Sequence, residues 1–171
     1  EQFIGLTDPV FYGWIRETYS LSPSVEELIR LYKDRLTVYY DTHHIDPEPG
    51  VTELLELLRA NGRKLAIASA STHVNINAAL KATGLGEFFP VRVSSEDVAH
   101  GKPEPDVYLE AARILGLEPG KLAAVEDSDP GCEAARRAGY SLVVGYRNPN
   151  SGAQTLGQAA IVTADFERIG P

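Results

Sequence analysis

Three short polar segments carry residue types that bind anions and cations. Ser69-Ala70-Ser71-Thr72 follows an apolar run and opens a predicted helix, where hydroxyl groups and free backbone amides favour an anion site. N-capping of that helix by Ser71 or Thr72 is the alternative interpretation. In Gly101-Lys102-Pro103-Glu104-Pro105-Asp106, the neighbouring glycine and prolines restrain the backbone around Lys102. This lysine is either a fixed positive charge or an ordinary surface side chain.

The third segment, Glu126-Asp127-Ser128-Asp129, places three carboxylates within four residues. A hard cation such as Mg²⁺, which prefers oxygen ligands, would relieve their mutual repulsion. An acidic helix start, capped by Asp127 or Ser128, would have the same sequence. Considered together, an anion cradle, a fixed cation and an acidic cluster predict a site for a phosphate group and Mg²⁺. The expected partner is therefore a small phosphorylated metabolite.

The elements expected around these segments define the fold class. Short apolar strands are expected at 65–68, 91–93, 122–125, 142–144 and 161–162, and helices at 52–60, 72–81, 105–115 and 130–138. Strands that alternate with helices and are apolar on both faces predict an α/β fold, with a Rossmann-like parallel sheet covered by helices. Ligands of such sheets bind beyond the carboxyl ends of the strands, and each polar segment follows one of the strands.

Residues 1–46 show a different pattern, because only helices are predicted there. One helix spans Leu6 to Tyr19, and a second begins at the capping box Ser24-Val25-Glu26-Glu27. The aromatic side chains crowded into this region predict a packed helical face. Asp46-Pro47-Glu48-Pro49-Gly50 is rich in residues that break secondary structure and is a candidate hinge. We therefore expect a helical unit over residues 1–47 and an α/β core over residues 48–171.

The composition disfavours several classes of protein. The 171 residues carry a net charge of −8 and their 16 basic residues are scattered, which argues against a nucleic-acid partner. No apolar run is long enough to cross a membrane. The single cysteine, Cys132, cannot form an internal disulfide, which fits a cytoplasmic location. Because the sequence contains no methionine, we expect residues to precede Glu1 in the natural protein.

The ordered set of segments resembles the haloacid dehalogenase superfamily, in particular the branch with a helical cap that includes phosphoglycolate phosphatases and beta-phosphoglucomutases. Leu65–Ser71 is similar to the second motif of that family, Gly101–Asp106 to the third and Val125–Gly131 to the fourth. The resemblance covers residues 48–145 well, and residues 1–46 resemble the cap more loosely. It implies an α/β core preceded by part of an α-helical cap domain.

The resemblance also implies a role for each matching residue. Ser69 would hydrogen-bond the transferring phosphoryl group, together with the backbone amide of Ala70. Lys102 would neutralise charge on that group and on the nucleophile. Glu126 and Asp127 would hold Mg²⁺. These roles suit phosphoryl transfer, in which positioning and charge stabilisation provide most of the catalysis.

One family motif has no counterpart in this sequence. The first motif of the family is Asp-x-Asp at the end of a central strand, and its leading aspartate is the nucleophile. The Asp-x-Asp at Asp127–Asp129 matches the fourth motif instead, and no other occurs in the 171 residues. We therefore expect the nucleophile and the first strand upstream of Glu1, and we expect the 171 residues alone to be inactive.

The activity that the resemblance implies is that of a Mg²⁺-dependent phosphatase of small phosphomonoesters, acting through an aspartyl-phosphate. A sugar-phosphate mutase of the beta-phosphoglucomutase type is one alternative. In such mutases a cap arginine grips a second phosphate, whereas the matching stretch here, Gly5-Leu6-Thr7-Asp8, has an aspartate that would repel it. The other alternative is a module that binds a phosphate ligand without turning it over, if the natural protein has no nucleophile.

Overall fold

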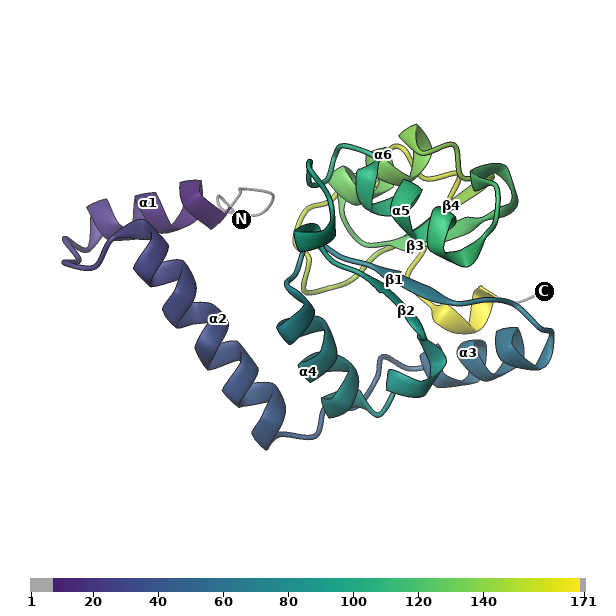
Figure 1. Cartoon of the computed structure of the whole chain (residues 1–171), viewed down its shortest axis with the longest axis horizontal. Helices are drawn as coiled ribbons and strands as arrows, with labels where there is room; N and C mark the ends of the chain where they lie inside the picture. The colour runs from purple at the N-terminus through teal and green to yellow at the C-terminus, as the bar shows by residue number, and fades with distance from the viewer. Residues whose placement is uncertain (1–7, 170–171) are drawn as a thin grey trace.

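The computed structural model describes residues 8–169, which form helices and parallel strands in alternation (Figure 1). The elements are α1 (Asp8–Thr18), α2 (Val25–Thr42), α3 (Val51–Ala60), β1 (Ala66–Ala68), α4 (His73–Thr83), β2 (Val91–Val93), α5 (Asp106–Leu115), β3 (Ala123–Glu126), α6 (Asp129–Arg137), β4 (Leu142–Tyr146) and β5 (Ile161–Thr163). Short 3₁₀ turns lie at Gly86–Phe88, Ser95–Asp97, Pro119–Lys121 and Phe166–Arg168.

The predicted helices and strands are confirmed, with boundaries that shift by two residues or fewer wherever the chain is described. The capping box also forms: the Glu27 amide donates to Ser24 Oγ at 3.2 Å, and the Ser24 amide donates to Glu27 Oε2 at 2.9 Å. Leu6, where the first helix was expected to start, lies outside the described residues. Local signals in the sequence therefore fix most of the secondary structure.

The strands are parallel as predicted, but the described residues arrange them in two sheets instead of one. β1 pairs with β2, with Ala66 opposite Val91. β3, β4 and β5 form the second sheet, in which Val125 lies opposite Val144 and Val144 opposite Ile161. Among the described residues, β1 and β3 each use only one of their two edges for strand pairing.

A single buried cluster joins the two sheets. α5 packs against β1 and β2, α6 packs against β3 and β4, and the two helices contact each other. Their buried side chains meet those of both sheets in a cluster that contains Val93, Val107, Tyr108, Ala111, Ala124, Cys132, Ala134, Ala135, Ala138, Val143 and Leu156. Helices α3 and α4 lie on the opposite side of the strands (Figure 1). They leave part of that face open, because Val125 is 45% exposed.

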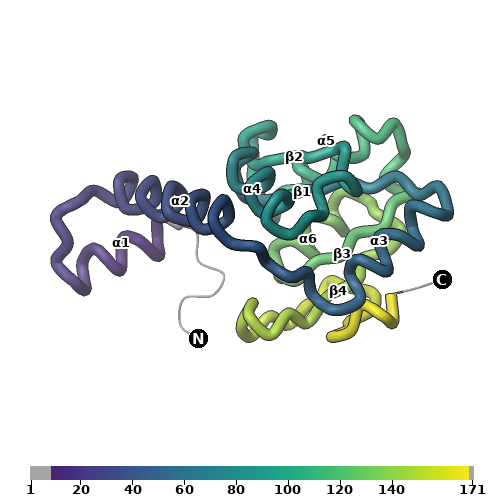
Figure 2. Tube along the Cα trace, turned by 90° about the horizontal axis from the view of Figure 1, so that it is seen from below, coloured from purple at the N-terminus to yellow at the C-terminus, as the bar shows by residue number. Residues whose placement is uncertain are grey.

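The helix pair α1–α2 stands to one side of the α/β part (Figure 2). α1 packs against α2, which packs against α4. Thr37 Oγ1 donates to Asn75 Oδ1 at 2.9 Å, and Lys81 Nζ contacts Asp41 Oδ1 at 2.9 Å.

The packed aromatic face predicted for the N-terminal helices is wrong in part. Tyr19 is 65% exposed, and Tyr32 and Tyr39 are about half exposed. The reason is that the described helices α1 and α2 form only a two-helix layer, which cannot enclose side chains on both of its faces. None of the described helices combines the length and the apolar character that crossing a bilayer requires.

Candidate active site

Lys102 links the carboxyl ends of the two sheets. Its Nζ donates to the carbonyl oxygen of Ala68, at the end of β1, at 3.1 Å. The same Nζ forms a short ion pair with Glu126 Oε1, at the end of β3. The two side chains are only 12% and 8% exposed, respectively. The lysine is therefore a fixed positive charge and not an ordinary surface side chain.

Glu126 has two further side-chain partners. The Tyr108 hydroxyl makes a short hydrogen bond to the oxygen that Lys102 contacts, and Ser128 Oγ donates to Glu126 Oε2 at 3.2 Å. Burial, followed by the Glu126 carboxylate, raises the pKa of Tyr108, so the phenol stays neutral and remains a donor. A Cβ at Gly131 would overlap the Glu126 carboxylate, so the absence of a side chain there allows α6 to begin against it.

Asp127 is held by the loop that follows β4. Asn148 Nδ2 donates to Asp127 Oδ2 at 2.8 Å, and Ser151 Oγ donates to the same oxygen at 2.5 Å. Both partners bond to Oδ2, and no hydrogen bond among the described residues involves Oδ1. The capping function expected of Asp127 or Ser128 belongs to Ser128, whose Oγ accepts from the Gly131 amide at 3.1 Å.

The Asp129 carboxylate is held by hydrogen bonds from the loop that follows β4. Its carboxylate accepts from the Leu156 amide at 2.6 Å, and from the amide and the hydroxyl of Thr155 at 3.1 and 2.9 Å. Burial alone would raise the pKa of Asp129, but the hydrogen bonds from residues 155–157 outweigh it and lower the pKa. Asp129 therefore anchors the loop after β4 to the start of α6. This agrees with the view that Asp127–Asp129 is not the nucleophile motif of the family.

The segment at the end of β1 differs from the expected helix N-terminal cradle. Thr72 caps α4 by accepting from the Asn75 amide, and the His73 amide donates to Glu96 at 2.8 Å. Two of the first three amides of the helix are thus already bonded. Ser69 lies directly after Ala68, the residue whose carbonyl contacts Lys102, and its Oγ accepts from the Ser71 amide at 3.1 Å.

The side chains that the sequence singled out thus gather at one edge of the molecule. Ser69 and Ala70 follow β1, and Lys102 reaches across to the end of β3. Glu126 is the last residue of β3 and Asp127 follows it. Ser69 is half-buried and Ala70 is exposed. Hydroxyl, ammonium and carboxylate groups therefore face the same strand-end region, as expected for parallel strands.

The donor set fits Mg²⁺ in its chemistry. Glu126 and Asp127 are adjacent carboxylates. Both oxygens of Glu126 have hydrogen-bond partners, whereas the two partners of Asp127 both bond to Oδ2. Within residues 8–169, no group of three or more His, Cys, Asp or Glu side chains could enclose a metal ion. Mg²⁺ is commonly bound by one or two carboxylates, with water and substrate phosphate completing its octahedron. The two carboxylates meet that requirement.

Sequence reasoning missed three residues of this network. Asn148 and Ser151 follow the carboxyl end of β4 in a polar loop, so the rule that located the other segments would have found them if applied to that strand. Tyr108 lies within α5, where a tyrosine at a buried position has no distinctive sequence signal. Its role depends on how α5 packs against β1 and β2, which brings the Tyr108 hydroxyl to Glu126.

Comparison with known families agrees with this arrangement of fold and site. The sequence pattern of the haloacid dehalogenase-like hydrolases matches residues 1–144. Parallel strands flanked by helices fit the core of a hydrolase of that type. The chain belongs to the haloacid dehalogenase-like hydrolase family.

Individual relatives share most of this chain. The protein CbbY of Rhodobacter capsulatus is 37% identical over 135 residues, which cover 75% of this chain and 60% of CbbY. A bifunctional riboflavin kinase/FMN phosphatase of Arabidopsis thaliana is 35% identical over 143 residues, which cover 83% of this chain and 37% of that protein. The chain thus spans three fifths or less of these two relatives.

A solved structure shows the same fold. It is that of CbbY from Rhodobacter sphaeroides in complex with xylulose-(1,5)bisphosphate, a mutant form of the protein. It superimposes with a TM-score of 0.79 at 26% identity, over 87% of this chain and 68% of CbbY.

Proposed function

We propose that the natural protein that contains this chain is a Mg²⁺-dependent phosphatase of small phosphomonoesters. The observation that carries the proposal is the position of Lys102, which lies between the end of β1 and Glu126 and is nearly buried. A fixed ammonium group beside a hydroxyl and two carboxylates provides charge stabilisation for a transferring phosphoryl group. The phosphatase activity named for the Arabidopsis relative supports the same reaction class.

The residues divide the work as follows. An ammonium group has three N–H donors, and Lys102 uses two for Ala68 and Glu126, which leaves one for a phosphoryl oxygen. Ser69 Oγ and the Ala70 amide would donate to the other phosphoryl oxygens. Glu126 and Asp127 would hold Mg²⁺, which supplies further neutralisation of phosphoryl charge.

The nucleophile in this proposal is an aspartate upstream of Glu1. Its carboxylate oxygen would form a bond to phosphorus as the bond to the alcohol oxygen breaks, and the departing oxygen would take a proton from the second aspartate of the same upstream motif and leave as the alcohol. Water would then attack phosphorus, which releases inorganic phosphate and restores the aspartate. One feature supports it: among the described residues, β1 and β3 each keep one edge free of strand pairing, which leaves an edge for a further strand. The 171 residues alone should then be inactive.

The helices of residues 1–47 would act as a cap over this site. The supporting observation is that α2 packs against α4, the helix that follows Ser69. The argument from Gly5–Asp8 against a second phosphate remains a prediction, because Gly5, Leu6 and Thr7 lie outside the described residues and the Asp8 side chain is not described. The cytoplasmic location also stays a prediction.

The test is phosphate release from a panel of phosphomonoesters by the natural protein. Lys102→Met should lower kcat by about 10²–10³-fold, the range for loss of one group that stabilises transition-state charge. Ser69→Ala should lower kcat in the same direction. Ser141→Ala is the matched control, because Ser141 Oγ donates to the Leu122 carbonyl at the opposite end of the strands. Phosphate binding without release, or near-normal turnover by Lys102→Met, would contradict the proposal.

A further inference from the structure

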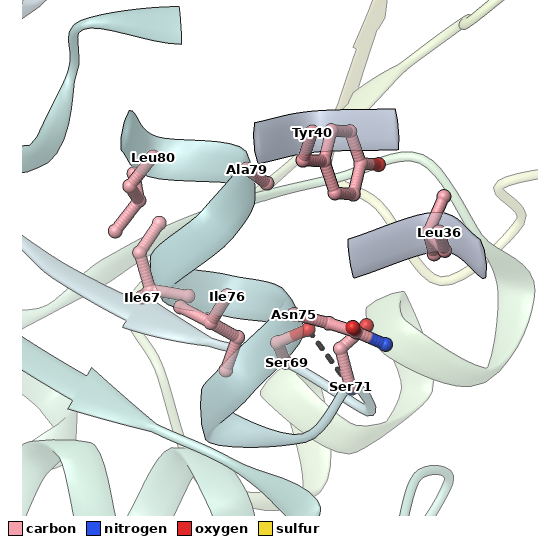
Figure 3. A pocket seen from close by; sticks show the side chains of 9 residues that line it. All are labelled: Leu36, Tyr40, Ile67, Ser69, Ser71, Asn75, Ile76, Ala79 and Leu80. Carbon is pink, nitrogen blue, oxygen red and sulfur yellow. Dashed lines mark hydrogen bonds between the residues drawn. The ribbon is translucent and has the colours of Figure 1, made fainter. Parts of the chain in front are cut away.

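A cavity of about 190 Å³ lies between α2 and α4, beside Ser69. It is lined by Leu36, Tyr40, Ile67, Ser69, Ser71, Asn75, Ile76, Ala79 and Leu80. Figure 3 shows that the lining is divided: the polar side chains of Ser69, Ser71 and Asn75 gather at one end, and Leu80, Ala79 and the ring of Tyr40 lie at the other. The cavity is therefore polar where it meets the candidate phosphoryl site and apolar farther away.

The chemistry of the lining limits what the cavity can accept. None of its nine residues carries a charge, and five have side chains made only of carbon and hydrogen. Asn75, which is 6% exposed, already uses its carbonyl oxygen to accept from Thr37. A hydroxyl group transferred from water to the apolar end would find the Tyr40 hydroxyl as its one side-chain partner among the lining residues there, so a sugar with several hydroxyl groups would lose most of its hydrogen bonds. A second phosphate there would meet no cationic side chain.

We propose that this cavity receives the organic group of the substrate and selects a phosphomonoester with one compact apolar group, of the size of a single aromatic ring, over sugar phosphates. The inference rests on the proposed function, because it places the phosphoryl group at Ser69. The volume supports it: an apolar cavity of about 150 Å³ is known to bind benzene. The ring of Tyr40 adds an aromatic surface for such a group.

The cavity also excludes larger groups. The cavity is partly open, and its volume of about 190 Å³ lets one six-membered ring pack fully between α2 and α4, whereas most of the fused three-ring system of FMN would remain outside it. Ile76 and Leu80 are nearly buried, so the apolar end cannot widen without moving α4. A phosphatase with this wall should therefore reject FMN and bisphosphorylated sugars alike.

The experiment compares kcat/KM for phenyl phosphate, glucose 6-phosphate and FMN with the natural protein and Mg²⁺. Because single apolar groups in a fitted pocket change kcat/KM by about tenfold or more, phenyl phosphate should be preferred by at least that factor. A preference for glucose 6-phosphate or FMN would overturn the inference while leaving the proposed phosphatase function intact.

Substitutions in the wall sharpen the test. Ala79→Leu adds volume inside the cavity and should reduce the ratio of kcat/KM for phenyl phosphate to that for methyl phosphate. Val74→Leu is the control, because Val74 lies on the same helix and is 61% exposed. Leu36→Ala enlarges the cavity at a half-buried position and should favour 2-naphthyl phosphate relative to phenyl phosphate. Equal ratios in Ala79→Leu and Val74→Leu, or no shift in Leu36→Ala, would overturn the inference.

Direct binding separates this inference from the reaction itself. If the natural protein released phosphate from no phosphomonoester, the proposed function would fail, but the cavity could still be probed with phenylphosphonate and the 171-residue chain. NMR signals of the Ile76 and Leu80 methyl groups should shift with phenylphosphonate and stay in place with methylphosphonate. Methyl signals that respond to neither ligand would overturn the cavity assignment.

Discussion

The strand-end site and the α1–α2 helix pair differ in how firmly the protein holds their side chains. Glu126 is 8% exposed and has three side-chain partners, Lys102, Tyr108 and Ser128. The 18-residue helix α2, in contrast, has no buried residue. Charges that stabilise a transition state need a fixed position, whereas a wall that recognises the organic group needs only the right shape. Substitutions on α2 could therefore change substrate selection without disturbing the charge network.

Removing the positive charge of Lys102 should have the largest effect on the free energy of unfolding. Lys102→Met leaves the buried Glu126 carboxylate without its cation, so the free energy of unfolding should fall by about 3–5 kcal/mol, in addition to the loss of turnover. Urea denaturation measures this. Lys81→Met is the control on the helix-pair side: its partner Asp41 is exposed, and the loss should be at most about 1 kcal/mol. Similar losses in both variants would remove the contrast between the two regions.

Crowding the same carboxylate should have the next largest effect. Gly131→Ala places a Cβ onto Glu126 and should lower the free energy of unfolding by about 1–3 kcal/mol, as overpacking does. Gly120→Ala is the matched control, because a Cβ at Gly120 meets no atom within 4 Å. The denaturation midpoints of Gly131→Ala and Gly120→Ala measure this difference in stability. A Gly131→Ala protein as stable as Gly120→Ala would show that Glu126 moves aside easily.

The stability contributed by the loop that holds the start of α6 should depend on pH. Because the pKa of Asp129 is lowered in the folded state, its stabilising contribution is complete above the unfolded pKa of about 3.9 and is lost as pH falls through the folded value. Asp129→Asn should therefore be less stable than the natural protein at pH 7, and this gap should narrow at pH 3. Thr155→Val should produce a smaller change of the same sign. A stability difference between the natural protein and Asp129→Asn that is the same at pH 7 and pH 3 would contradict this role of Asp129.

The smallest effect is expected between α2 and α4. Thr37→Val removes the hydrogen bond to Asn75 and should cost about 0.5–1.5 kcal/mol. Thr42→Val is the control, because Thr42 Oγ1 bonds only to carbonyl oxygens and a side chain of its own helix region. Thermal denaturation can compare the two. A cost for Thr37→Val that exceeds the cost for Gly131→Ala would reverse the ranking of the two regions.

Much of the fold was predictable from sequence, because it depends on local signals. Apolar runs and helix-ending glycines such as Gly84 and Gly116, both left-handed in the structure, set the element boundaries. The division into two sheets was not predictable in this way, because strand pairing depends on which edges meet in space. The exposure of Tyr32 and Tyr39 was missed for a related reason, since periodicity identifies a helical face but not what covers it.

The site was predictable where its residues follow strands and not where they approach from elsewhere. Ser69, Lys102 and Glu126 could be assigned to one edge because parallel strands align their carboxyl ends. Tyr108 reaches Glu126 from a helix, and its contribution depends on tertiary packing. The expectation of free helix amides after Ser69 was wrong in part. Glu96, which is distant in the sequence, accepts from the His73 amide, and Thr72 caps the helix as the alternative interpretation proposed.

The most direct test of the phosphatase proposal is the Mg²⁺ dependence of phosphate release by the natural protein and its Asp127→Asn variant. The account predicts saturable activation, with a half-saturating Mg²⁺ concentration that rises in the variant by at least the roughly 10–100-fold typical of weaker, outer-sphere changes. Asn148→Ala, which removes one hydrogen bond to Asp127, should give an intermediate rise. Phosphate release that needs no Mg²⁺, or an unchanged half-saturating concentration in Asp127→Asn, would contradict it.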